Sequence, residues 1–151
     1  NIMRTCAGVN AKLHLIEPLG FSLNSSKIKR SGVNYLEHCN YEIYEDINNF
    51  YAKNSGTFYY LTRYATKSYT AVNYSNPNEN IYLIFGKEST GIPKDILHNN
   101  LDYTLRIPTN SNIRALNLSN SVAIVLFEAL RQQNFNDLLL YDQEKGKDYL
   151  E

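Results

Sequence analysis

The sequence predicts an α/β fold in which helices cover both faces of a mostly parallel sheet, because strand-like and helix-like segments alternate along its 151 residues. The apolar run IYLIF at 81–85 is typical of a strand buried on both faces. The segment 117–133 carries apolar residues around nearly the whole circumference of a helix. No repeat or composition shift divides the chain, so we expect one domain over 1–151, with 136–151 as a tail.

Helices are expected where apolar residues recur three or four positions apart or where cap residues mark a start. Asn1 is a good N-cap for the first helix, and Pro93 suits the first position of a later one. The expected helices are 1–10, 26–31, 46–53, 93–98 and 117–133. The expected strands are 12–17, one or two within 35–44, 57–62, 81–85 and 103–107.

Two loops follow predicted strands, at 85–93 and 107–117. In parallel sheets ligands bind beyond the carboxyl ends of the strands, so these loops are the expected binding region. The helix 117–133 must be covered on all sides. In a domain of this size we expect one of its faces to meet the sheet and another to meet a second subunit.

Composition excludes several functional classes. The 15 basic and 15 acidic residues balance, which argues against a protein that coats nucleic acid non-specifically. A local basic patch around Lys29 and Arg30 remains compatible with this balance. No apolar run approaches the roughly 20 residues of a membrane helix, so no membrane contact is expected. Cys6 and Cys39 are interpreted as free thiols of a cytoplasmic, reducing compartment.

Common catalytic and cofactor motifs are absent from the sequence. It contains no G-x-G-x-x-G dinucleotide fingerprint, no complete phosphate loop, no nucleophile elbow and no H-E-x-x-H. The three histidines, His14, His38 and His98, are isolated from one another, and we interpret them as structural or surface residues. No metal site is therefore expected.

Three segments together resemble one family. They are NIMR at 1–4, LIFGKESTGIP at 83–93, and RIP at 106–108 followed by NLSNSVA at 117–123. They are similar to the three motifs of the SPOUT RNA ribose 2'-O-methyltransferases, over residues 1 to about 135. HLIEPLGF at 14–21 and KRSGVNY at 29–35 resemble the TrmL (YibK-like) branch, which methylates the wobble ribose of tRNA.

The resemblance implies a fold, a cofactor and partners. SPOUT domains carry a deep trefoil knot at the carboxyl-terminal end, formed by the two loops and the last helix. They use S-adenosylmethionine as methyl donor and work as homodimers, here through the C-terminal helix. The TrmL branch acts on the anticodon stem-loop of tRNA, at cytidine or uridine 34.

The resemblance also implies which residues bind the cofactor. Glycine at 86 suits a strand end where backbone passes close to backbone, and Gly91 suits a tight turn. Without the resemblance, Leu61, Ile107 and Leu116 would be interpreted as core residues. The implied cofactor-binding residues are Leu61, Gly86, Glu88, Ile107, Ala115 and Leu116.

The resemblance implies that Arg4 is the catalytic residue, because the arginine in the first motif of the family is assigned to activating the ribose hydroxyl. A guanidinium stays protonated in nearly all settings, so we expect Arg4 to hold a phosphate and stabilise the developing alkoxide. The expected RNA-binding residues are Asn1, Arg4, Lys29, Arg30 and Arg114.

The chain departs from the family at two places. The family has a strand upstream of the position of Asn1, and we expect that this first strand is missing here. Phe127 stands where the branch often has tyrosine. Alternative hypotheses are a 2'-O-methyltransferase for another tRNA or rRNA ribose, a non-catalytic knotted RNA-binding module, and a flavodoxin-like binding protein.

Overall fold

The strands pair in parallel, as the sequence predicts. The structure is a computed structural model that describes residues 1–20 and 35–151. In this part of the chain the strands form two sheets, of two and three strands. The first contains β1 (Leu13–Ile16) and β2 (Tyr41–Tyr44), and the second is ordered β4 (Ile81–Phe85), β3 (Thr57–Leu61), β5 (Thr104–Leu105).

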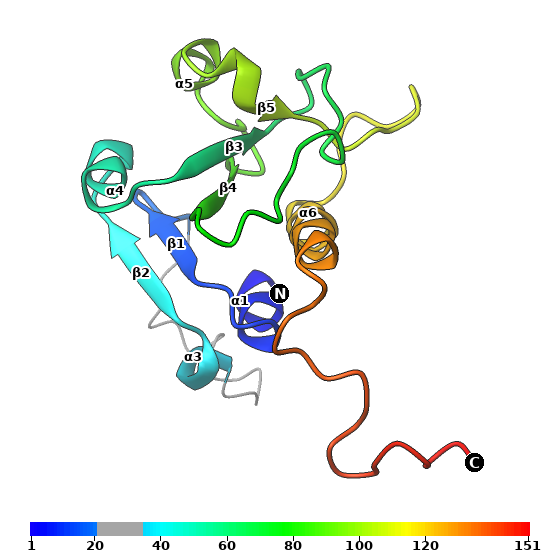
Figure 1. Ribbon diagram of the computed structural model, residues 1–151. Coiled ribbons are helices and arrows are strands. Elements are labelled where there is room, and N and C mark those ends of the chain that lie inside the picture. The colour runs from blue at the N-terminus through cyan, green and yellow to red at the C-terminus, as the bar shows by residue number, and fades with distance from the viewer. Residues whose placement is uncertain (21–34) are drawn as a thin grey trace.

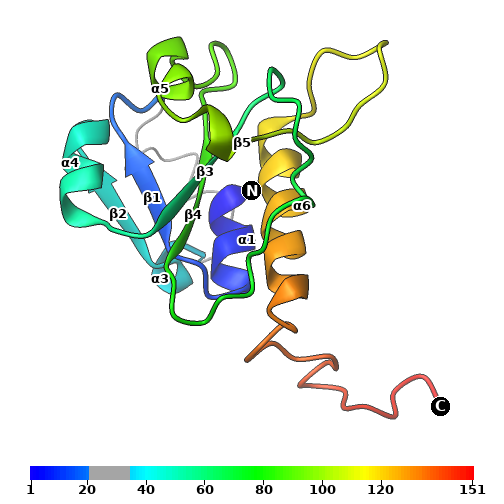
Figure 2. The same cartoon turned by 45° about the horizontal axis from the view of Figure 1, so that its top comes forward.

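Helices lie on both sides of the strands, which confirms the predicted layers. The helix α1 lies beside α6 on one side, and α4 and α5 lie on the opposite side (Figure 1, Figure 2). The short helices α3 and η1 complete the described elements. The bounds are α1 (Ile2–Gly8), α3 (Tyr35–His38), α4 (Ile47–Lys53), α5 (Lys94–His98), η1 (Leu101–Tyr103) and α6 (Leu118–Gln132).

Side chains cap two of the described helices, and Pro93, expected as the first residue of a helix, lies at the N-cap position one residue before α5. Asp46 accepts a hydrogen bond from the Asn49 N–H at 2.7 Å and so caps α4. Asn117 caps α6 in the same way, as described with the site below. Asn1 occupies the N-cap position of α1, but its side chain makes no cap bond. There the Thr5 N–H and hydroxyl both donate to the Asn1 carbonyl instead.

The strands expected within 35–44 and over 103–107 differ most from their expected ranges. Residues 35–38 form one turn of helix, which agrees with the high helix propensity of leucine and glutamate within it. The strand expected over 103–107 is reduced to β5, because the backbone changes partner after Leu105. Arg106 pairs with the loop at Ser68 instead of with β3, and its N–H donates to the Lys67 carbonyl at 2.8 Å. The helix expected at 26–31 lies outside the described residues.

The strand β4 is less buried than predicted. All five of its residues are half-buried, although the apolar run IYLIF favours burial on both faces. The reason is its place at the edge of the three-stranded sheet, where β3 is its one ladder partner in the described part of the chain.

Aromatic side chains join the two sheets. The ring of His14 in β1 lies 5.6 Å from the ring of Tyr82 in β4. Phe50 of α4 is 2% exposed and packs edge-on against Tyr44, Phe58 and Tyr82. The His14 Nδ1 is hydrogen-bonded to the Tyr44 hydroxyl at 2.8 Å, and burial lowers the pKa of this imidazole. His14 is therefore a structural residue, as predicted.

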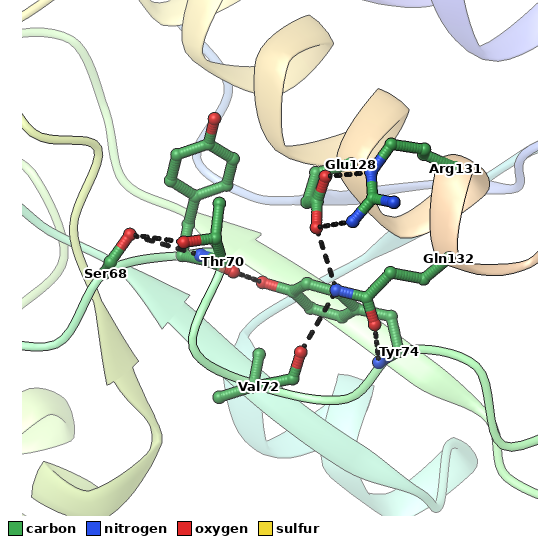
Figure 3. A network of polar contacts seen from close by, with 8 residues as sticks. Ser68, Thr70, Val72, Tyr74, Glu128, Arg131 and Gln132 are labelled. Carbon is green, nitrogen blue, oxygen red and sulfur yellow. Dashed lines mark hydrogen bonds and ion pairs between the residues drawn. The ribbon is translucent and has the colours of Figure 1, made fainter.

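A second core lies between the three-stranded sheet and α6. Tyr74, Leu105 and Ala129 form its buried centre. Gln132 of α6 fastens the loop that carries Tyr74: its amide oxygen accepts from the Tyr74 N–H at 2.8 Å, and its amide nitrogen donates to the Val72 carbonyl at 3.1 Å (Figure 3). The loop between β3 and β4 is thus attached to the last helix of the chain.

Helix α6 buries one face and leaves another open. Val122, Val125 and Ala129 are buried, whereas Ile124 is 36% and Phe127 46% exposed. The prediction that one face meets the sheet is confirmed, and an apolar stripe remains on the surface. None of the helices in the described ranges is long and apolar enough to span a membrane.

Candidate active site

A cavity of about 330 Å³ lies where three parallel strands end. Leu61 is the last residue of β3, Gly86 follows the last residue of β4, and Ile107 lies two residues beyond β5. All three residues line the cavity. This is the edge at which open parallel sheets bind ligands, and the volume is within the roughly 300–1,000 Å³ of small-molecule sites.

Five of the six residues predicted to bind the cofactor line this cavity. Besides the three at the strand ends, these are Glu88 and Leu116. Ala115, the sixth, is exposed and is not among the lining residues. Its neighbour Arg114, predicted to contact RNA, does line the cavity. Leu116 is half-buried. Because Arg114 and Leu116 line the cavity and Ala115 between them does not, the loop presents every second side chain to the cavity at this point.

Gly86 allows two backbone segments to meet in the wall of the cavity. A Cβ atom at this position would lie 2.0 Å from the backbone carbon of Gly91 and 2.2 Å from the backbone nitrogen of Ile92. No side chain fits there, which confirms the predicted close approach of backbone to backbone. Gly91 has a φ of +73°, and its N–H donates to the Lys87 carbonyl at 2.7 Å, which confirms the tight turn.

Asn117 connects this turn to α6. Its side-chain oxygen accepts from the N–H groups of Ser119 at 2.9 Å and Asn120 at 3.3 Å, so it caps the helix. Its side-chain nitrogen donates to the Glu88 carboxylate at 3.3 Å. Glu88 therefore supports the loop through the Asn117 side chain.

Several further residues line the cavity that the sequence interpretation did not place there, and Arg63 and Tyr64 are among them. They follow β3 directly, so the rule on strand ends that selected Leu61 also covers them. Arg63 donates a hydrogen bond to the Tyr64 hydroxyl. The charges of Arg63 and Arg114 lower the pKa of this hydroxyl, with the Arg63 hydrogen bond as the largest cause.

Comparison with known proteins identifies the family. A model of the SpoU rRNA Methylase family matches residues 1–127. The chain belongs to this family. A candidate tRNA (cytidine(34)-2'-O)-methyltransferase of Geobacillus stearothermophilus is 48% identical to the chain over 139 residues, 91% of this chain and 88% of the relative.

Solved structures agree with this membership of the SpoU methylase family. A candidate RNA methyltransferase from Bacillus anthracis has a TM-score of 0.89 and 45% identity, with 93% of this chain and 89% of that chain covered. A structure described in terms of the 2-OH methylation of C/U34 on tRNA has a TM-score of 0.79 and 32% identity, and covers 88% and 86%. These values also support the α/β fold class that the alternation of segments predicts.

The first motif of this SpoU methylase lies outside the cavity wall. Asn1 and Arg4 are exposed on α1, and neither lines the cavity. The helix α1 packs against α6 and α3. The predicted catalytic role of Arg4 and the RNA contact of Asn1 therefore stay predictions. Lys29 and Arg30 lie outside the described residues.

The described residues of this SpoU methylase show the state of its two cysteines and the grouping of possible metal ligands. Cys6 and Cys39 are free and buried. Burial raises the pKa of Cys6 to about 11, with a smaller contribution from Cys39, so this thiol is a poor nucleophile at neutral pH. Within residues 1–20 and 35–151, no three His, Cys, Asp or Glu side chains gather to hold a metal ion.

Proposed function

We propose that this SpoU methylase transfers a methyl group from S-adenosylmethionine to the ribose 2'-hydroxyl of the wobble nucleotide of tRNA, cytidine or uridine 34. The cavity at the ends of three parallel strands supports the proposal most directly. The two relatives whose descriptions refer to position 34 of tRNA indicate the substrate.

The residues of the cavity fit this cofactor. Leu61, Ile107 and Leu116 supply apolar surface for an adenine ring, and the adjoining loops supply backbone polar groups for its edge. Gly86 keeps the loop 86–92 closed behind this surface, because any side chain there would push the loop open. S-adenosylmethionine, when bound, supplies an activated methyl group.

Arg4 is proposed to act on the substrate side of the reaction. A guanidinium remains protonated, so Arg4 serves as a positive charge that holds a phosphate and favours loss of the ribose proton. Positioning of this kind contributes several kcal/mol to many reactions. Asn1, Lys29, Arg30 and Arg114 are proposed to contact the RNA.

The proposal includes a homodimer formed through α6. Ile124 and Phe127 leave an apolar stripe on the surface of this helix, and the ring of Phe135 lies 6.5 Å from that of Phe127. Burying such a stripe against a second copy removes it from water. We also propose that the enzyme works in the cytoplasm, where tRNA and free thiols coexist.

The trefoil knot is likewise part of the proposal. The close approach of Gly86 to Gly91 and the hydrogen bond from Asn117 to Glu88 bring the loop 86–92 and the start of α6 together. A deep knot in this region requires such contacts between the two loops and the helix.

The decisive experiment is transfer of a labelled methyl group to bulk unmodified tRNA, followed by nucleoside mapping. Label on the ribose of nucleotide 34 is the expected result. Label on another ribose would mean that the enzyme methylates that nucleotide instead. Calorimetry with S-adenosylmethionine separates the enzyme from a non-catalytic RNA-binding module, which has no need of the cofactor. The Arg4→Ala variant should lose transfer while its cofactor affinity stays unchanged, and comparable turnover would exclude the assigned role.

A further inference from the structure

Two arginines converge on one tyrosine at the rim of the cavity. The Arg63 guanidinium donates to the Tyr64 hydroxyl and also lies over the Tyr64 ring, with its Cζ 4.6 Å from the ring centroid. Arg114 comes from the other loop and lines the same cavity as Arg63 and Tyr64. Its charge also lowers the pKa of the Tyr64 hydroxyl. Tyr64 is 70% exposed, so this group of three side chains faces solvent. We call Arg63, Tyr64 and Arg114 the rim cluster.

The rim cluster carries positive charge that the described residues do not neutralise. Three cationic residues line the cavity, Arg63, Lys87 and Arg114, against one acidic residue, Glu88. The ion pairs within residues 1–20 and 35–151 involve neither Arg63 nor Arg114, since they join Lys12 and Lys53 to Glu42 and Arg131 to Glu128. This local excess stands out in a chain whose net charge is zero. Two guanidinium groups that line one cavity repel each other, and an anion between them would relieve that repulsion.

The backbone that carries Arg63 and Tyr64 is firmly held. The Arg106 Nη1 donates to the Arg63 carbonyl at 2.9 Å, and the Thr62 N–H donates to the Leu105 carbonyl at 2.9 Å. The Tyr69 N–H donates to the Arg106 carbonyl at 2.9 Å on the far side of the loop. The end of β5 thus fixes the loop on both sides of Tyr64. Donors held in this way lose little freedom when they bind a ligand.

We propose that Arg63, Tyr64 and Arg114 bind one phosphodiester group of the RNA, beside the nucleotide that receives the methyl group; this inference rests on the proposed function. Guanidinium groups donate to phosphate oxygens in pairs, which gives both attraction and a fixed orientation. The Tyr64 hydroxyl accepts a hydrogen bond from Arg63 and keeps its own proton, which it can donate to a further phosphate oxygen. The carboxylate of the cofactor is the other anion available, but the solvent exposure of Tyr64 favours a ligand that arrives from outside the cavity.

The test compares Arg63→Gln, Arg114→Gln and the double variant. Each single variant should raise the Kd for an unmodified tRNA transcript about tenfold at low salt, because charge-assisted hydrogen bonds to a phosphate are lost. If both arginines hold the same phosphate, the double variant should also lose about tenfold, well short of a hundredfold. The slope of log K against log salt should become shallower by roughly 0.7–0.9, which is the value for one phosphate contact.

Lys53→Gln is the matched control, since it removes one positive charge on α4, away from the cavity. It should leave both the Kd and the salt slope near the wild-type values. Cofactor affinity, measured by calorimetry, should be unchanged in all variants. Unaltered tRNA binding in the double variant would overturn the proposal, and so would weakened cofactor binding with intact tRNA binding. If the wild type binds the transcript in this way but transfers no methyl group, the proposed function fails while the phosphate site stands.

Discussion

Substituting Gly86 by alanine tests how tightly the loop 86–92 closes on itself. The added Cβ would lie 2.0 Å from the Gly91 backbone carbon, whereas ordinary contact begins at 3.4 Å, so the two segments must separate by about 1.4 Å. Both neighbours are backbone atoms, which cannot rotate away as the end of a side chain can. Overpacking of this kind typically costs 1–3 kcal/mol and occasionally more, and we expect about 3 kcal/mol for Gly86→Ala.

The assay is thermal unfolding together with calorimetry of S-adenosylmethionine binding. A loss of about 3 kcal/mol lowers the Tm of a domain this size by about 6–12 °C. Cofactor affinity should fall as well, because the displaced loop lines the cavity. Gly8→Ala is the control: a Cβ there meets nothing within 4 Å, so this variant should be as stable as the wild type or up to about 1 kcal/mol more stable. Gly86→Ala with wild-type stability and affinity would refute the reasoning.

Three further predictions concern α6. Asn117→Ala should cost about 1 kcal/mol in thermal unfolding, because it removes the cap, whereas Asn120→Ala should cost little; equal losses would contradict the capping role. Hydrogen bonds from Arg131 and Gln132 lower the pKa of Glu128 from 4.5 to about 2. The wild type should therefore have a larger free energy of unfolding than Glu128→Gln above pH 4.5, and this difference should vanish as the pH falls to about 2. A difference in urea unfolding that does not change with pH would contradict this. Phe127→Asp should yield monomers in sedimentation velocity, while Leu150→Asp in the exposed tail should not; unchanged sedimentation of Phe127→Asp would exclude the proposed dimer.

Much of the fold could be predicted because local signals and tertiary structure agree. Asp46 and Asn117 cap their helices, and β4 occupies the residues that its apolar run indicates. The degree of burial of β4 could not be predicted, since an apolar run does not reveal whether a strand lies at the centre or the edge of a sheet. The end of β5 depends on the approach of the loop at Ser68, a contact between distant parts of the chain.

The candidate site was predictable at its apolar wall and less so at its rim. Gly86 has a backbone requirement that only glycine meets, so its role could be inferred from the motif. Arg63 and Tyr64 carry no motif signal, and their importance depends on the approach of Arg114 from another loop. Ala115 failed to line the cavity because neighbouring loop residues point in different directions, which motif matching does not resolve.

The attachment of the loop between β3 and β4 to α6 has a consequence for biosynthesis. Gln132 contacts Tyr74 across 58 residues, and Gln133 donates to the Tyr74 carbonyl across 59. On the ribosome, the nascent chain emerges from its N-terminus, so this loop waits unattached until the last helix leaves the exit tunnel. The strand ends can assemble earlier, but the loop that connects them becomes fixed only after α6 has emerged. Premature termination within α6 would therefore release a segment that lies near the middle of the sequence.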